Sequence, residues 1–209
     1  GRAFIYFAYP TELSGDVVWV AGLADNGSID GYSGATALGI AALEGMNGIN
    51  NNFSWGQTFF GQIPGSIGET STFLILLAGA YMVYTKIASW RIIFGTLAGM
   101  VLMSSTLNFI GSDTNPMFAI PWYWHLTIGS FAFGLVYMAT EPVSAANTNM
   151  GRWIYGISIG VIVVLIRVIN PAFPEGMMLA ILFANLLAPA IDFTITSLNT
   201  SRRMERYNS

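Results

Sequence analysis

A threonine at the start of an apolar segment is the residue of this sequence best placed for covalent chemistry. The helix-compatible run Ala37–Leu43 follows it, and the stretch itself reads Asp30-Gly31-Tyr32-Ser33-Gly34-Ala35-Thr36. We interpret Ser33 as the helix N-cap, which places Thr36 at the third helical position. A phosphate ester on Thr36 would then lie beside free N–H groups and the positive end of the helix dipole. Gly34 and Ala35 leave room for a bulky group.

The same spacing is also typical of an ordinary surface helix. A serine at an N-cap needs no role beyond accepting a hydrogen bond from a backbone N–H group. Residue types and spacing alone therefore leave two interpretations of Thr36 open, a phosphoester acceptor and a plain helix residue.

A carboxylate within the last apolar segment is the second candidate for chemistry. Asp192 lies in Gly176–Leu198 and follows Pro189, which should free a backbone carbonyl one turn earlier. Charged residues inside membrane segments are costly and mark ion pathways or ion pairs. We therefore consider Asp192 a transient sodium contact. The alternative is a carboxylate paired with Arg152 or with an arginine of the C-terminal tail.

The composition indicates what must position these residues. Hydrophobic residues make up 54% of the 209 and charged residues only 9%, where soluble domains carry about 25% charge. The net charge is −3 and the basic residues form no continuous face, which argues against nucleic acid as a partner. With no cysteine and one histidine, the chain alone cannot build a cysteine-ligated iron–sulfur cluster or a bis-histidine haem. We predict an all-α membrane protein.

The chain divides at about residue 69 into a part rich in Gly, Asn, Ser and Asp and a part made of long apolar runs. We expect residues 1–69 to hold the end of a preceding membrane helix and a loop region, 70–198 a five-helix bundle, and 199–209 a tail. A bilayer core requires about 20 apolar residues per helix. Five segments approach that length: Thr70–Thr85, Arg91–Ile110, Ile120–Thr140, Arg152–Ile169 and Gly176–Leu198.

Basic residues predict the orientation, because short cytoplasmic loops are enriched in Lys and Arg. The alternate loops contain Asp113 and Glu175 but no Lys or Arg, so we expect them outside. The region of Thr36 is then periplasmic and the C-terminus cytoplasmic. The residues that share the inner side are Lys86, Arg91, Arg152, Arg202, Arg203 and Arg206.

Local patterns predict how the segments begin and pack. Ser66 and Glu69 have the spacing of a capping box at the start of the first segment. Two G-x-x-x-G patterns, Gly95–Gly99 and Gly156–Gly160, predict close helix packing in lipid.

The run D-x-x-S-G-A-T resembles the recognition sequence of a flavin transferase that moves FMN from FAD onto a threonine hydroxyl. The resemblance implies that Thr36 is the acceptor and that Asp30, Ser33, Gly34 and Ala35 belong to the recognition motif. That transferase acts outside the cytoplasmic membrane of bacteria, on the side where the loop charges place Thr36.

The remaining segments are similar to the NqrB family of the sodium-translocating NADH:quinone reductases. The related RnfD proteins share the flavinylation motif and the Gly65–Ser71 element, so we keep an RnfD-type subunit of an ion-pumping ferredoxin:NAD oxidoreductase as an alternative. The stretches that carry the likeness are Phe7–Pro10, Ser14–Asp16, Gly65–Ser71, Pro121–Leu126, Met138–Ala145 and Asn170–Met178.

The resemblance is to the second half of a ten-helix subunit, which implies the second of two inverted repeats. It implies a bacterial inner-membrane protein in a complex with an NADH-oxidising subunit and a second FMN-bearing subunit. Electrons would pass through FMN on Thr36 and a non-covalent riboflavin to ubiquinone while Na⁺ leaves the cell. No G-x-G-x-x-G fingerprint indicates an NADH site, and we assign no catalytic residue. Residues that contact riboflavin or quinone are not assigned.

Three polar residues have simpler interpretations. Glu141 precedes Pro142, so we expect it to end a helix near the inner surface and to be solvated. Arg167 lies near the outer end of its segment, where snorkelling, pairing with a helix C-terminus or contact with the flavin phosphate would each explain it. We interpret His125 as a hydrogen-bonded residue of the aromatic belt rather than as a proton relay. A secondary transporter half or a structural scaffold would leave the threonine motif without a role.

Overall fold

Helices are the regular secondary structure in the described part of the chain. The computed structural model describes residues 4–5, 8–9, 36–63, 65, 68–112, 114–170 and 175–208, and none of these lies in a strand. The predicted all-α class is therefore confirmed. Residues of the motif before Thr36, namely Asp30, Ser33, Gly34 and Ala35, lie outside the described residues, as do Ser66 and Asp113.

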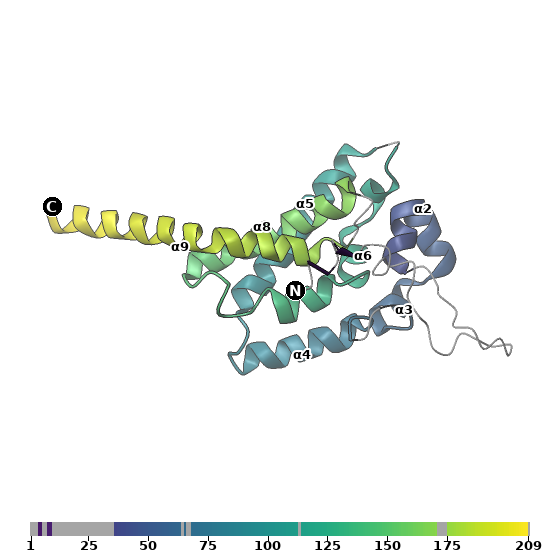
Figure 1. The fold of residues 1–209 in the computed structure, drawn as a ribbon, viewed down its shortest axis with the longest axis horizontal. Coiled ribbons are helices and arrows are strands. Elements are labelled where there is room, and N and C mark those ends of the chain that lie inside the picture. Colours follow the sequence, from purple (N-terminus) through teal and green to yellow (C-terminus); the bar gives the residue numbers. More distant parts are fainter. Residues whose placement is uncertain are drawn as a thin grey trace.

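In the described part of the chain, three helices are long and apolar enough to cross a membrane. They are α5 (Trp90–Ile110), α8 (Asn149–Ile169) and α9 (Met177–Asn208). Their first residues lie within three positions of the predicted starts, because each begins where an apolar run begins. α9 continues as a helix beyond the predicted end at Leu198 and projects away from the other helices toward the C-terminus (Figure 1).

The other two predicted spans differ from long helices. α4 (Thr72–Tyr84) has 13 residues and falls short of the length that a span requires. The segment Ile120–Thr140 is broken, so five continuous membrane helices are not found in the described part of the chain. This segment contains two short helices, α6 (Trp122–Thr127) and α7 (Phe131–Phe133), and the π-helical turn η3 (Gly134–Met138). The 3₁₀ helix η2 (Pro116–Ala119) directly precedes it.

The break falls between α6 and α7. Gly129 has a φ of 68°, a left-handed conformation that side chains other than glycine rarely adopt. Apolar residues lie on both sides of Gly129, so hydropathy, which depends on composition alone, does not predict this break.

The helices α2 and α3 lie between Thr36 and α4. α2 (Ala37–Asn52) bends at Gly45, whose φ is 64° and ψ −146°. α3 (Trp55–Phe60) begins with a capping box formed by Ser54 and Gln57. The capping box predicted from Ser66 to Glu69 does not start α4, because that helix begins at Thr72.

Ser71 is the N-cap of α4 instead. Its side chain accepts a hydrogen bond from the N–H group of Leu74 at 3.4 Å. Glu69 lies in the turn before this cap, which places it at the wall of a neighbouring site described below.

α5 and α8 pack with their backbones in contact (Figure 1). A Cβ added at Gly99 would lie 2.3 Å from the carbonyl oxygen of Ile157, and one at Gly160 would lie 2.2 Å from that of Thr96. The other two glycines, Gly95 and Gly156, are also close to the facing backbone. The packing predicted from the G-x-x-x-G patterns is confirmed.

α9 packs against the other side of α8. Ala180, Ala184 and Ala188 recur at every fourth position of α9 and are all buried. One turn before Pro189, the hydroxyl of Tyr155 in α8 donates a 2.5 Å hydrogen bond to Oδ1 of Asn185. α8 is thus held between α5 and α9.

We expect Gly99→Ala and Gly160→Ala each to destabilise the protein, because the new methyl group would overlap a backbone oxygen. Overpacking of this kind costs about 1–3 kcal/mol, and each kcal/mol lowers the melting temperature of a chain of this size by about 2–4 °C. Thermal unfolding in detergent, followed by circular dichroism, measures the change. Gly56→Ala is the matched control, since a Cβ there meets nothing within 4 Å. Equal melting temperatures for all three variants would contradict this account of the interface.

Candidate functional site

Thr36 is itself the N-cap of α2. Its backbone is extended, with φ −67° and ψ 154°, and its Oγ1 accepts a hydrogen bond from the N–H group of Gly39 at 3.1 Å. The prediction that Ser33 caps this helix and that Thr36 occupies its third position is wrong. The helix begins at Ala37, so the threonine directly before it is in the position of the N-cap.

At the cap position, the hydroxyl proton of Thr36 takes part in no hydrogen bond among the described residues. The residue is half-buried, and its only hydrogen bond among the described residues uses the oxygen as an acceptor. Replacing the hydroxyl proton by another group would therefore break no hydrogen bond of the described chain. An added group would also lie beside the N–H groups that begin α2, which attract negative charge.

A small hollow separates Thr36 from the broken segment. Glu69, Thr127 and Glu175 bring polar atoms to it from three different parts of the chain. Leu38 packs against Gly129, where an added Cβ would lie 2.7 Å from its Cδ2 atom. The lining residues are Thr36, Ala37, Leu38, Ile63, Gly65, Glu69, Thr70, Thr127, Gly129 and Glu175.

A buried arginine contacts the broken segment that lines this hollow. The Arg167 side chain is 0% exposed, and its two terminal nitrogens donate to the carbonyl oxygens of His125 at 2.8 Å and Ile128 at 3.1 Å. Glu175 and Glu69 supply the negative charge nearest to it. Of the three interpretations offered for Arg167, snorkelling is wrong, because the side chain does not reach solvent. Arg167 does pair with a helix C-terminus, but this is the end of α6 rather than the end of its own helix. Contact with a flavin phosphate stays a prediction.

Glu175 binds the chain directly after the break. Its Oε2 accepts hydrogen bonds from the N–H group of Ser130 at 3.1 Å and from its hydroxyl at 2.5 Å. Arg167 and Glu175 together satisfy the backbone around Gly129, which explains how irregular chain is stable inside the bundle. Sequence reasoning used Glu175 only as a topological marker, and no local signal linked it to Ser130.

His125 is more deeply buried than a belt residue. It is 1% exposed, and its Nδ1 atom has no hydrogen-bond partner among the described residues. Its backbone carbonyl, rather than its ring, is the group that Arg167 binds.

Asp192 binds the start of α8. Its carboxylate accepts hydrogen bonds from the N–H groups of Asn147 at 2.6 Å and Thr148 at 3.1 Å, and from the Thr148 hydroxyl at 2.6 Å. Thr148 is in turn the N-cap of α8 and accepts from the N–H group of Gly151 at 3.1 Å. Arg152 contributes electrostatic attraction without being the closest partner. The spacing of 44 residues between Asp192 and Thr148 explains why sequence reasoning missed this pair.

The two predicted sites lie at opposite ends of α8. Thr36 shares a hollow with Gly129, which lies beside Arg167, and Asp192 is near Gly151. The 16 residue steps from Gly151 to Arg167 span about 24 Å at 1.5 Å per step. The structure therefore does not bring Thr36 and Asp192 together.

Basic residues meet at the Asp192 end. Lys86, Arg91 and Arg152 line one pocket at the starts of α5 and α8, as the loop pattern predicts for residues that share a side. Nearby, Glu141 accepts hydrogen bonds from the Ser144 hydroxyl at 2.5 Å and from the N–H groups of Ser144 and Val143 at 2.9 and 3.1 Å. These bonds, led by the Ser144 hydroxyl, hold the pKa of Glu141 below its usual range.

Long apolar helices with glycine contacts, and a broken segment fastened by buried charge, define a helical membrane protein. Comparison with known sequences identifies its family: residues 1–200 match the model of the NQR2, RnfD, RnfE family, so the chain belongs to this family.

Its relatives include NqrB proteins of the Na(+)-translocating NADH-quinone reductase from several bacteria. The protein from Azotobacter vinelandii is 60% identical over 207 residues, 99% of this chain and 50% of the relative. That from Neisseria meningitidis serogroup A is 57% identical over 213 residues, 100% of this chain and 50% of the relative. That from Pseudomonas aeruginosa is 55% identical over 207 residues, with 99% and 50% coverage. The chain spans about half the length of these relatives.

We expect Arg167→Met to destabilise the protein by about 3 kcal/mol or more, because removing one member of a buried charged network leaves its partners uncompensated. The carbonyl oxygens of His125 and Ile128 would lose their donor. Thermal unfolding in detergent measures the loss, with Arg203→Met on the exposed end of α9 as the matched control. An Arg167→Met protein as stable as this control would show that the buried guanidinium does not hold the broken segment.

Proposed function

We propose that this chain is part of the membrane flavoprotein subunit of a Na⁺-translocating NADH:quinone reductase and carries FMN as a phosphoester on Thr36. The observation that carries the proposal is the Thr36 hydroxyl, half-buried at a helix N-cap and facing a hollow. The names of its relatives and the D-x-x-S-G-A-T run support it. The flavin, when bound, supplies one-electron redox chemistry, and the protein's part is to hold it.

The attachment has a simple chemical balance. Thr36 Oγ1 attacks the FMN phosphorus of FAD, the Oγ1–P bond forms, the pyrophosphate bond breaks with AMP leaving, and the hydroxyl proton is lost. A flavin transferase would catalyse this step on the periplasmic side, with Asp30, Ser33, Gly34 and Ala35 as its recognition residues.

Charge at the site would favour one position for the phosphate of an attached group. Glu69 and Glu175 line the hollow and would repel a phosphate, although Arg167 offsets part of their charge. The N–H groups at the start of α2 would attract it instead and would hold it beside Thr36.

The rest of the complex would supply the other steps. Electrons would come from NADH through the NADH-oxidising subunit and the second FMN-bearing subunit, and leave through riboflavin to ubiquinone. The protein would lie in the bacterial inner membrane with Thr36 in the periplasm and Arg202, Arg203 and Arg206 in the cytoplasm. An RnfD-type protein is the second candidate, and the NADH-quinone reductase names of the relatives argue against it.

We expect Thr36→Asn to abolish covalent flavin while leaving α2 capped. Asparagine caps helices as well as threonine but has no hydroxyl to esterify. Thr36→Ser keeps both functions and is the matched control. Expression of the full-length protein in a host that flavinylates, with in-gel flavin fluorescence and mass spectrometry of the peptide from Asp30 to Leu43, measures the outcome. Fluorescence retained in Thr36→Asn would remove Thr36 as the acceptor.

Asp192 is the proposed transient sodium contact. Among the described residues, no three acidic, histidine or cysteine side chains gather around a common point, so Asp192 would share the ion with backbone carbonyl oxygens.

We expect Asp192→Asn to raise the sodium concentration for half-maximal quinone reduction by the whole complex about tenfold, equal to about 1.4 kcal/mol of lost ion binding. Thr148→Ala is the control, because it removes the cap of α8 and one hydrogen bond to Asp192 but keeps the carboxylate. Both changes should lower the melting temperature by similar amounts. A sodium dependence shifted equally in both variants would indicate a structural role for Asp192 alone.

A further inference from the structure

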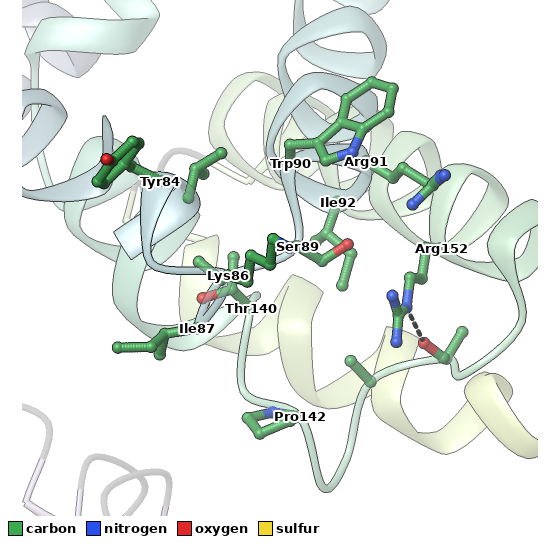
Figure 2. Close-up of a pocket in the computed structure, with 14 residues that line it drawn as sticks. Tyr84, Lys86, Ile87, Ser89, Trp90, Arg91, Ile92, Thr140, Pro142 and Arg152 are labelled. Carbon is green, nitrogen blue, oxygen red and sulfur yellow. Dashed lines mark hydrogen bonds between the residues drawn. The ribbon is translucent and has the colours of Figure 1, made fainter. Parts of the chain in front are cut away.

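A basic pocket opens at the end of the bundle away from Thr36. It lies between the turn after α4, the first residues of α5, the turn after η3 and the start of α8. In Figure 2, Lys86 and Ser89 lie near its middle, with Arg91 and Arg152 along one side. The residues that line it include these three cations and no acidic side chain.

The first turn of α5 adds hydrogen-bond donors to this pocket. Ser89 occupies the N-cap position, yet its side chain makes no capping bond. Its Oγ atom is buried and has no partner among the described residues. A 21-residue helix therefore begins at the pocket with its dipole uncapped and with a buried hydroxyl beside it.

Both arginines are held in place by contacts that spare their terminal nitrogens. The Arg91 guanidinium lies over the Trp90 ring, 4.9 Å from its centre. Arg152 donates through Nε to the carbonyl oxygen of Ala146 at 3.3 Å. Planar guanidinium groups positioned in this way suit the oxygens of a phosphate.

The nearest acids are already engaged elsewhere. Asp192 attracts Arg152 but gives its oxygens to Asn147 and Thr148. Glu141 gives its oxygens to Val143 and Ser144. Neither carboxylate takes the place of an external anion at the centre of the pocket.

The turn after α4 contains a residue with an unfavourable backbone conformation. Lys86 has a φ of 61° and is the one residue other than glycine, in the described part of the chain, with a positive φ. The left-handed conformation is unfavourable for a lysine, and such residues concentrate where a ligand is bound. Lys86 in this conformation is the third cation that lines the pocket.

We propose that this pocket binds a phosphate group, held by Arg91, Arg152 and Lys86 and by the start of α5. Tyr84, Ile87 and Trp90 are 84%, 64% and 43% exposed at its rim, where a membrane-spanning bundle meets lipid headgroups. The phosphate of an anionic phospholipid and free inorganic phosphate share this chemistry.

The lipid arm of the test uses the full-length protein in its complex, purified in detergent and titrated with phosphatidylglycerol. Native mass spectrometry counts the lipids retained. Arg91→Gln combined with Arg152→Gln should weaken retention about tenfold or more, because two charge-assisted contacts are lost. Arg202→Gln combined with Arg203→Gln removes the same charge from the exposed end of α9 and should leave retention unchanged.

The phosphate arm uses the same proteins without added lipid. Inorganic phosphate should raise the melting temperature of the wild type above that in chloride of equal ionic strength if the free anion is the ligand. A pocket-dependent effect in either arm supports the proposal and identifies the source of the phosphate. Equal behaviour of the two double variants in both arms would overturn it. Neither arm depends on flavin, so failure here is distinct from failure of the Thr36 assignment.

Discussion

Direct contact between the backbones of α5 and α8 is the constraint on which the other features depend. Lipid offers little hydrophobic drive for two helices to associate, so close packing and polar contacts must hold them. Four glycines allow that approach, with Gly99 and Gly160 closest to the facing carbonyl oxygens. Because the two helices are fixed along their length, the first turn of α5 lies beside Arg152 at one end. At the other end the Arg167 side chain is fixed where it can reach the broken segment.

The broken segment is the second constraint. Its backbone groups are stabilised by charged side chains rather than by apolar packing. Backbone groups around Gly129 cannot pair within a helix, and a membrane interior offers no water to replace those bonds. Arg167 supplies two donors and Glu175 accepts two hydrogen bonds from Ser130. Glu175 and Gly129 also form part of the wall that faces Thr36. The stability of the irregular chain and the electrostatics of the threonine site are therefore set by one network.

Much of this fold could be predicted from the sequence, and the errors share a cause. The long helices and the α5–α8 contact follow from apolar runs and glycine spacing, which are local patterns. The break near Gly129 was missed because its neighbours are as apolar as an intact span. The N-cap was misplaced by three residues because serine and threonine are both residue types that cap helices, and serine is slightly the better one. The partners of Asp192 and Glu175 lie 44 or 45 residues away along the chain, where no local pattern reaches.

The separation of the two ends limits how they can act on each other. Thr36 and Asp192 bracket α8, and about 24 Å of helix lies between the residues of α8 that they approach. α8 packs so closely against α5 that a Cβ added at Gly99 or Gly160 would overlap the facing backbone. We therefore expect a shift of α8 that coupled Thr36 to Asp192 to displace α5 as well. The break at Gly129 would have to move with them, because Arg167 connects it directly to α8.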